Sequence, residues 1–94
     1  MTNQSTPEIR LANRKALFWD IGPERITSVL HENDHWAVMR IFEYGSIDDV
    51  LDCIQLYGRK KVIAVLNDSK PGRVAYVMAY FSLGFDPEGR YRES

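Results

Sequence analysis

The sequence has little of what would place it outside ordinary globular domains. Its 94 residues include a single cysteine, so no disulfide can form within the chain. Its 12 lysines and arginines nearly balance 13 aspartates and glutamates, and the net charge of −1 lacks the bulk positive charge of many nucleic-acid-binding domains. No apolar run approaches the roughly 20 residues that span a bilayer, and no apolar stretch follows a basic start. We therefore expect a cytoplasmic protein with no membrane partner.

What is present indicates one domain. The hydrophobic fraction of 45% and the charged fraction of 27% are typical of globular proteins. The chain is polar up to Pro7, and it is polar again after Phe85, where Pro87 and Gly89 interrupt regular structure. We expect a disordered tail at residues 1–7, a single helical domain at residues 8–85 and a polar C-terminal tail at residues 86–94.

Apolar residues recur with helical spacing through most of this domain. The clearest helix should begin at Ser46, whose hydroxyl forms a capping box with Asp49, and end at Gly58. Gly45 is expected to end the preceding helix in a left-handed conformation. The last helix, near residues 71–83, is apolar on two sides, which predicts a central position. The fold class is therefore all-α, a compact bundle of four to five short helices.

The segment before Gly22 is the hardest to assign. Helically spaced apolar residues precede the continuous apolar run of residues 17–19, and Gly22-Pro23 stops whatever comes before. We expect a short helix or an extended arm that lays Phe18 and Trp19 on the core. If these aromatic side chains were exposed instead, they would be candidate anchors for a protein partner.

Residues 31–35 match the H-E-x-x-H pattern of zinc hydrolases. In such enzymes two histidines one helical turn apart bind the metal, and the glutamate activates a water molecule. Here Asn33 and Asp34 predict a helix break between His31 and His35, which would separate the two ligands. A zinc hydrolase is therefore the remote alternative, and we expect no metal and no cofactor.

The residues Arg59, Lys60 and Lys61 form the densest basic run. It is a candidate contact for an acidic partner or a phosphate backbone, and Lys70 and Arg73 could extend it. Such runs more often lie on a solvated helix start. Residues 50–69 also suggest a helix-turn-helix around Gly58, although the helix after it offers few side chains able to read base edges. A DNA-binding regulator is therefore the alternative function.

Signatures of enzymes are missing. The glycines are scattered and form no phosphate-binding loop. The carboxylates of Asp48, Asp49 and Asp52 lie in the first turns of a predicted helix, where the helix dipole explains them. Cys53 falls within a helical pattern and is expected to be buried and unreactive. We expect a protein that is not an enzyme.

Several short motifs together resemble a known family. Residues 17–20 read L-F-W-D, residues 43–45 read E-Y-G and residues 57–59 read Y-G-R. This pattern resembles a family of short, uncharacterised bacterial proteins, many of them encoded beside nucleotidyltransferase toxins of the AbiEii type. The resemblance covers residues 17–85 and implies an antitoxin-like partner of such a toxin, with no catalytic residues to carry over. The expected function is a protein–protein interaction module, and apolar helix faces on so small a chain are also compatible with a homodimer.

Overall fold

The computed structural model describes residues 6–86 and confirms the all-α fold class. Connections between the successive helices from α2 onward are one to three residues long, and no strand occurs in the part of the chain described. None of the described helices is long and apolar enough to cross a membrane. The elements are α1 (Pro7–Ala12), the 3₁₀ helix η1 (Pro23–Arg25), α2 (Ile26–Glu32), α3 (Asp34–Tyr44), α4 (Ile47–Tyr57), α5 (Arg59–Ser69) and α6 (Arg73–Leu83).

The ends of the helical domain lie slightly outside the predicted bounds. The Thr6 hydroxyl accepts a hydrogen bond from the Ile9 amide and Pro7 is the first residue of α1, so the domain begins before residue 8. At the other end, Asp86 is buried and accepts a hydrogen bond of 2.6 Å from the Tyr76 hydroxyl. Of the predicted tails at residues 1–7 and 86–94, residues 1–5 and 87–94 lie outside the described residues.

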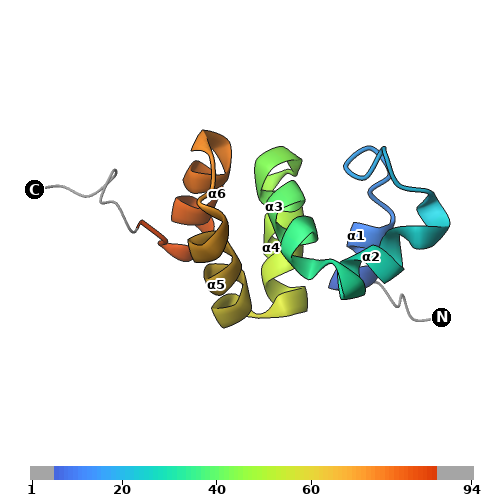
Figure 1. Cartoon of the computed structure of the whole chain (residues 1–94), viewed down its shortest axis with the longest axis horizontal. Helices are drawn as coiled ribbons and strands as arrows, with labels where there is room; N and C mark the ends of the chain where they lie inside the picture. The colour runs from blue at the N-terminus through green and yellow to red at the C-terminus, as the bar shows by residue number, and fades with distance from the viewer. Residues whose placement is uncertain (1–5, 87–94) are drawn as a thin grey trace, which may run out of the picture.

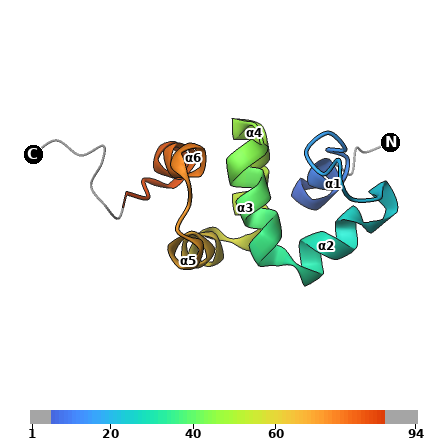
Figure 2. The ribbon, with the colours of Figure 1, turned by 45° about the horizontal axis from the view of Figure 1, so that its top comes forward.

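The α3–α4 hairpin occupies the centre of an elongated molecule measuring 51 × 30 × 21 Å (Figure 1). α1 and α2 lie at one end, and α5 and α6 lie at the other. α4 contacts both α1 and α6, while α3 contacts both α2 and α5, so the helices form two rows (Figure 2). α3 also contacts α6, which closes the two rows against each other.

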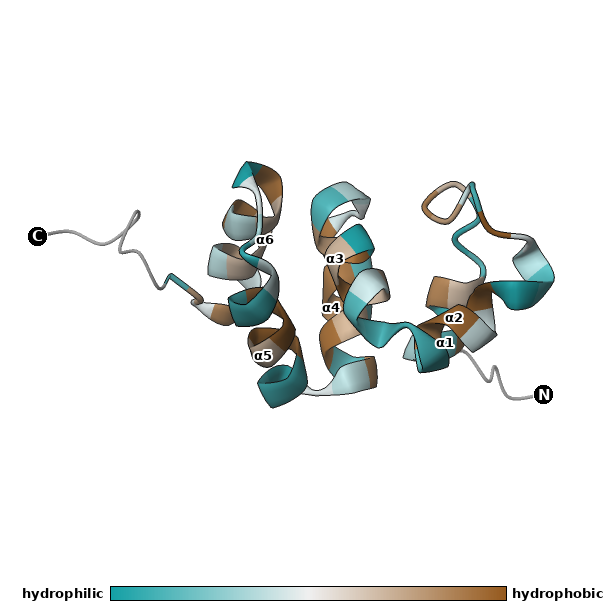
Figure 3. Cartoon of the chain, in the orientation of Figure 1, coloured by the Kyte–Doolittle hydropathy of each residue, from teal (hydrophilic) through white to brown (hydrophobic). Residues whose placement is uncertain are grey.

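The prediction that α6 is central is wrong, because α6 lies at one end of the molecule. Its buried side consists of Ala75, Tyr76, Ala79 and Leu83, whereas Val74 and Phe81 are exposed. The second apolar side, which suggested a central helix, is only partly covered: Met78 packs against the core, and Val74 lines a hollow with Glu43 and Tyr44. The buried core instead centres on α3, where Phe42 is fully buried. In Figure 3 the hydrophobic segments of α3, coloured brown, face those of α4 to α6.

Two glycines set the tight connections on either side of α4. Gly45 has an extended backbone, with φ −84° and ψ 169°, so its predicted left-handed conformation is wrong. It is needed for space, because a Cβ atom there would lie 2.6 Å from the Ile41 carbonyl oxygen. Gly58, with φ +91°, adopts a conformation that other residues rarely take, and it alone joins α4 to α5.

Candidate functional site

The short helix expected before Gly22 is present as α1, but it ends at Ala12, and residues 13–21 form a series of tight turns between α1 and η1. The Phe18 amide donates to the Arg14 carbonyl, and the Ile21 amide donates to the Phe18 carbonyl. Leu17 and Phe18 are buried in the core, whereas the Trp19 side chain is 77% exposed. The sequence prediction is thus right for Phe18, which packs in the core, and the neighbouring tryptophan is the exposed aromatic of the pair.

Arg40, in the middle of α3, holds these turns in place. Its guanidinium donates to the Leu17 carbonyl at 3.0 Å and to both carboxylate oxygens of Asp20 at 3.0 Å. The guanidinium carbon also lies 4.5 Å from the ring centroid of Trp36 and 5.7 Å from that of Tyr44. Hydrogen bonding from Arg40 keeps the pKa of Asp20 below its usual value, so this carboxylate stays charged at neutral pH. Trp19 is therefore carried between a buried Phe18 and an anchored Asp20.

A second ion pair fixes the start of the same turns to α4. Arg14 donates from Nε and a terminal nitrogen to the two oxygens of Asp49, at 2.8 and 2.9 Å. The Asp49 carboxylate also accepts from the Ser46 amide at 2.9 Å, which completes the predicted capping box. Burial raises the pKa of Asp49, but the bonds from Arg14 and Ser46 and the charge of Arg14 outweigh it and lower the pKa overall.

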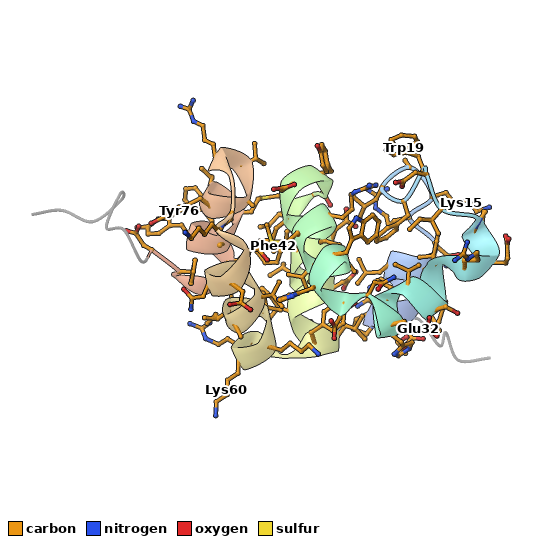
Figure 4. The ribbon with its side chains drawn as sticks, in the orientation of Figure 1. Lys15, Trp19, Glu32, Phe42, Lys60 and Tyr76 are labelled. Atoms are coloured by element: carbon orange, nitrogen blue, oxygen red, sulfur yellow. The ribbon has the colours of Figure 1, made fainter. Side chains whose placement is uncertain are left out.

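Tyr44 is a second exposed aromatic residue at the same edge of the molecule. It ends α3 with its side chain 74% exposed. The edge of the molecule is hollowed between Tyr44 and Trp19, and in Figure 4 the Trp19 side chain lies at the margin of the molecule, clear of the helices. We call this region the Trp19–Tyr44 surface, and its lining consists of Arg14, Ala16, Leu17, Trp19 and Tyr44.

The basic run of residues 59–61 is dispersed by internal contacts. The Arg59 guanidinium donates to the Leu83 carbonyl at 2.7 Å, where it satisfies the C-terminal end of α6. Lys61 forms an ion pair with Asp34 of α3. Lys60 points away from the helices (Figure 4), and Lys70 follows the opposite end of α5, about 16 Å along the helix axis. Two of the three predicted contact residues thus have partners inside the molecule, and Lys70 does not extend the run.

The predicted pair of helices around Gly58 is present as α4 and α5. The connection is a single residue, shorter than the three or four residues usual in a helix-turn-helix. The inward residues of α5 are Val62, Val65 and Leu66, and its first turn carries the dispersed basic run.

The two histidines of the H-E-x-x-H match do not share a helix. α2 ends at Glu32 and α3 begins at Asp34, with Asn33 in a non-helical conformation, so the predicted break is confirmed. His31 lies 3.1 Å from Glu8 of α1, whereas His35 lies 3.8 Å from Asp68 of α5. Within residues 6–86 no three His, Cys, Asp or Glu side chains are grouped to hold a metal ion. The geometry of a zinc hydrolase is therefore not formed at this motif.

Sequence reasoning missed Arg40 and Tyr44. Arg40 is a charged residue within an otherwise apolar stretch of α3, and such a position indicates an internal ion pair. The same reasoning assigned Asp49 to the capping box and the helix dipole and Asp52 to the dipole, and it missed that each binds an arginine of the N-terminal segment. The sequence did carry a signal for these two ion pairs. Arg10 and Arg14 lie four residues apart, which is close to the three-residue spacing of Asp49 and Asp52, so two arginines with the spacing of one helical turn can face the two aspartates of another.

Comparison with protein families gives a match to a family of unknown function over residues 13–66. The matched range contains the Trp19 turn, both of its ion pairs and α2 to α4, and it ends before α6. Comparison with curated proteins and with solved structures gives no match. More than half of the chain thus fits the family model, and the protein belongs to the family of unknown function DUF6922.

Proposed function

We propose that this protein is a protein–protein interaction module, not an enzyme, and that it contacts its partner through the Trp19–Tyr44 surface. The observation that carries the proposal is the exposed Trp19 side chain on a turn that is fixed on both sides. A large aromatic side chain costs free energy when it lies in water, and tryptophan and tyrosine are enriched among the residues that dominate binding energies.

The anchoring of the turn favours binding. Phe18 is fully buried and Arg40 holds Asp20 by two hydrogen bonds, so the backbone that carries Trp19 is already ordered before a partner arrives. A preordered contact residue loses less conformational entropy on association, and a larger part of the contact energy then appears as affinity. Tyr44 widens the contact area on the other side of the hollow.

The partner that we propose is a nucleotidyltransferase toxin of the AbiEii type. The support for this choice is the resemblance of residues 17–20, 43–45 and 57–59 to proteins encoded beside such toxins. Two of these three motifs contribute to the Trp19–Tyr44 surface, since residues 17–20 carry Trp19 and residues 43–45 carry Tyr44. By this proposal the chain acts as an antitoxin-like protein in the cytoplasm.

DNA binding through residues 59–61 is the less favoured function. Phosphate contacts need cations that are free to face the duplex, because affinity depends on the number of phosphates neutralised. Arg59 and Lys61 are engaged with Leu83 and Asp34, which leaves Lys60 as the outward cation of the run.

The test is binding of the purified protein to a purified AbiEii-type nucleotidyltransferase from the same genome, measured by isothermal titration calorimetry. We expect a complex in which Trp19→Ala raises the dissociation constant by about 30-fold or more, as for a contact that dominates an interface. Phe81→Ala is the matched control, because Phe81 is a similarly exposed aromatic residue of α6, the helix at the other end of the molecule.

Each part of the proposal has its own refuting outcome. No measurable binding by the wild-type protein would reject the toxin as the partner. Binding that Trp19→Ala leaves unchanged, or that Phe81→Ala weakens instead, would reject the Trp19–Tyr44 surface as the contact.

A further inference from the structure

The Arg14 guanidinium lines the hollow of the Trp19–Tyr44 surface with one of its nitrogens unused. Nε and Nη2 donate to the two carboxylate oxygens of Asp49, at 2.8 and 2.9 Å. Nη1 forms no hydrogen bond with any residue in the range 6–86, although the Arg14 side chain is 40% exposed. A guanidinium nitrogen of this kind carries two N–H donors. The hollow between the two aromatic side chains therefore contains donors that a partner can satisfy.

The charges around this hollow leave a single positive charge without a partner. Arg14 is paired with Asp49 and Arg40 is paired with Asp20, so each of these pairs is neutral. Lys15 is exposed and forms no ion pair with a described residue. It lies in the sequence between two residues that line the hollow, and Figure 4 shows it on the turns between α1 and η1. The hollow is therefore matched in charge to one anionic group.

Glu43 does not change this balance, although it precedes Tyr44 in the sequence. It lines a second hollow, together with Tyr44 and with Gly72 and Arg73 at the start of α6. The opposite charges of Glu43 and Arg73 thus share that second hollow. Among the described residues, no aspartate or glutamate lines the hollow that contains Arg14.

We propose that the protein partner places the carboxylate of an aspartate or glutamate in this hollow, where it accepts hydrogen bonds from Nη1 of Arg14 between the side chains of Trp19 and Tyr44. The inference rests on the proposed function and names the chemical group that the Trp19–Tyr44 surface recognises. A hydrogen bond between ionised groups is about twice as strong as a neutral one, and aromatic side chains that exclude water strengthen it further. Asp49 already orients the guanidinium, so little side-chain entropy is lost on binding.

A nucleic acid is the other occupant that exposed aromatic side chains and a cation suggest, because bases stack on such rings. Its affinity depends on the number of phosphates that cations neutralise. Here Lys15 is the one cation in excess, and the carboxylate of Asp20 follows Trp19 on the same turn. The charges of this surface thus favour a single carboxylate over a row of phosphates.

The test compares Arg14→Ala with Asp49→Ala in calorimetric titrations against the purified AbiEii-type nucleotidyltransferase from the same genome. Both variants lose the same internal ion pair, but only Arg14→Ala removes the donor to the partner. We expect Arg14→Ala to raise the dissociation constant about tenfold more than Asp49→Ala does. The titrations are made at a temperature at which circular dichroism shows both variants to be folded.

A second pair of variants tests the charge without touching an internal contact. Lys15→Glu should raise the dissociation constant by about tenfold, because it replaces the excess cation with an anion. Lys60→Glu is the matched control, since Lys60 is also an exposed lysine but lies at the start of α5, far from the turns that carry Trp19. The control should leave the dissociation constant unchanged.

The outcomes separate this inference from the proposed function. Equal rises for Arg14→Ala and Asp49→Ala, in a complex that Trp19→Ala still weakens, would overturn the carboxylate contact and leave the interaction surface in place. A dissociation constant that Lys15→Glu leaves unchanged would also overturn it. A wild-type protein that does not bind the toxin would reject the proposed function and this inference together. A gel shift of oligouridine that Arg14→Ala abolishes would assign the hollow to a nucleic acid instead.

Discussion

Replacing Asp49 with alanine should destabilise the protein more than any other single loss of an ion pair in the described residues. The Asp49 side chain is 5% exposed, and its carboxylate accepts bonds from the Ser46 amide and from two nitrogens of Arg14. Losing the cap costs about 1 kcal/mol. Losing the bonds to the charged arginine costs about 1–2 kcal/mol, a value reduced because the Arg14 side chain is 40% exposed and can be rehydrated. The expected loss in the free energy of unfolding is about 2–3 kcal/mol.

Urea unfolding followed by far-UV circular dichroism measures this loss. For a chain of this size it corresponds to a fall in Tm of about 10–20 °C. Asp52→Ala is the matched control, because Asp52 binds Arg10 from the same helix, α4, and the two arginines are similarly exposed, but the Asp52 side chain is 13% exposed and lies outside the capping box that Asp49 completes. The control should cost clearly less. In a double-mutant cycle, Arg14→Ala should cost little once Asp49 is absent. A loss below about 0.5 kcal/mol for Asp49→Ala, or equal losses at Asp49 and Asp52, would refute the reasoning.

Three further predictions follow from the same geometry. The pKa of Asp49 is lowered in the folded state, so its stabilising contribution is present above the unfolded pKa of about 3.9 and is lost as the pH falls through the folded pKa. The free energy of unfolding of the wild-type protein should therefore drop below about pH 4. The drop should be smaller in Asp49→Asn. Burial raises the pKa of the Cys53 thiol to about 12, so a thiol reagent should react with the unfolded protein and not with the native one. Gly45→Ala should lower the free energy of unfolding by about 1–3 kcal/mol in urea titrations, because its Cβ atom would meet the Ile41 carbonyl; an unchanged midpoint would contradict that contact.

The helices were predictable because local signals fix them. The Ser46–Asp49 capping box, the break at Asn33 and the turn at Gly58 are each decided within a few residues of sequence. The position of α6 was not predictable from its own sequence, because an apolar side looks the same whether another helix covers it or solvent does. Periodicity gives the faces of a helix and leaves open what they pack against.

The candidate site was harder to predict than the fold. Exposure of Trp19 and burial of Phe18 depend on a run of turns whose hydrogen bonds cross to α3. Its anchor, Arg40, lies 20 residues further along the chain from Asp20, and no local pattern connects the two. The engagement of Arg59 with the end of α6 is likewise a contact between distant residues, so the basic run looked freer in the sequence than it is.

The short connections from α2 to α6 have a consequence for the order in which the protein folds. Helices joined by one to three residues meet their neighbours with little loop to close, and proteins rich in such local contacts fold in microseconds to milliseconds. The N-terminal segment is the exception, since Arg10 and Arg14 must find Asp52 and Asp49 across 42 and 35 residues. We expect these contacts to form after the central hairpin, so the turn that carries Trp19 acquires its shape last. A nascent or damaged chain would then lack the Trp19–Tyr44 surface until the rest of the molecule is in place.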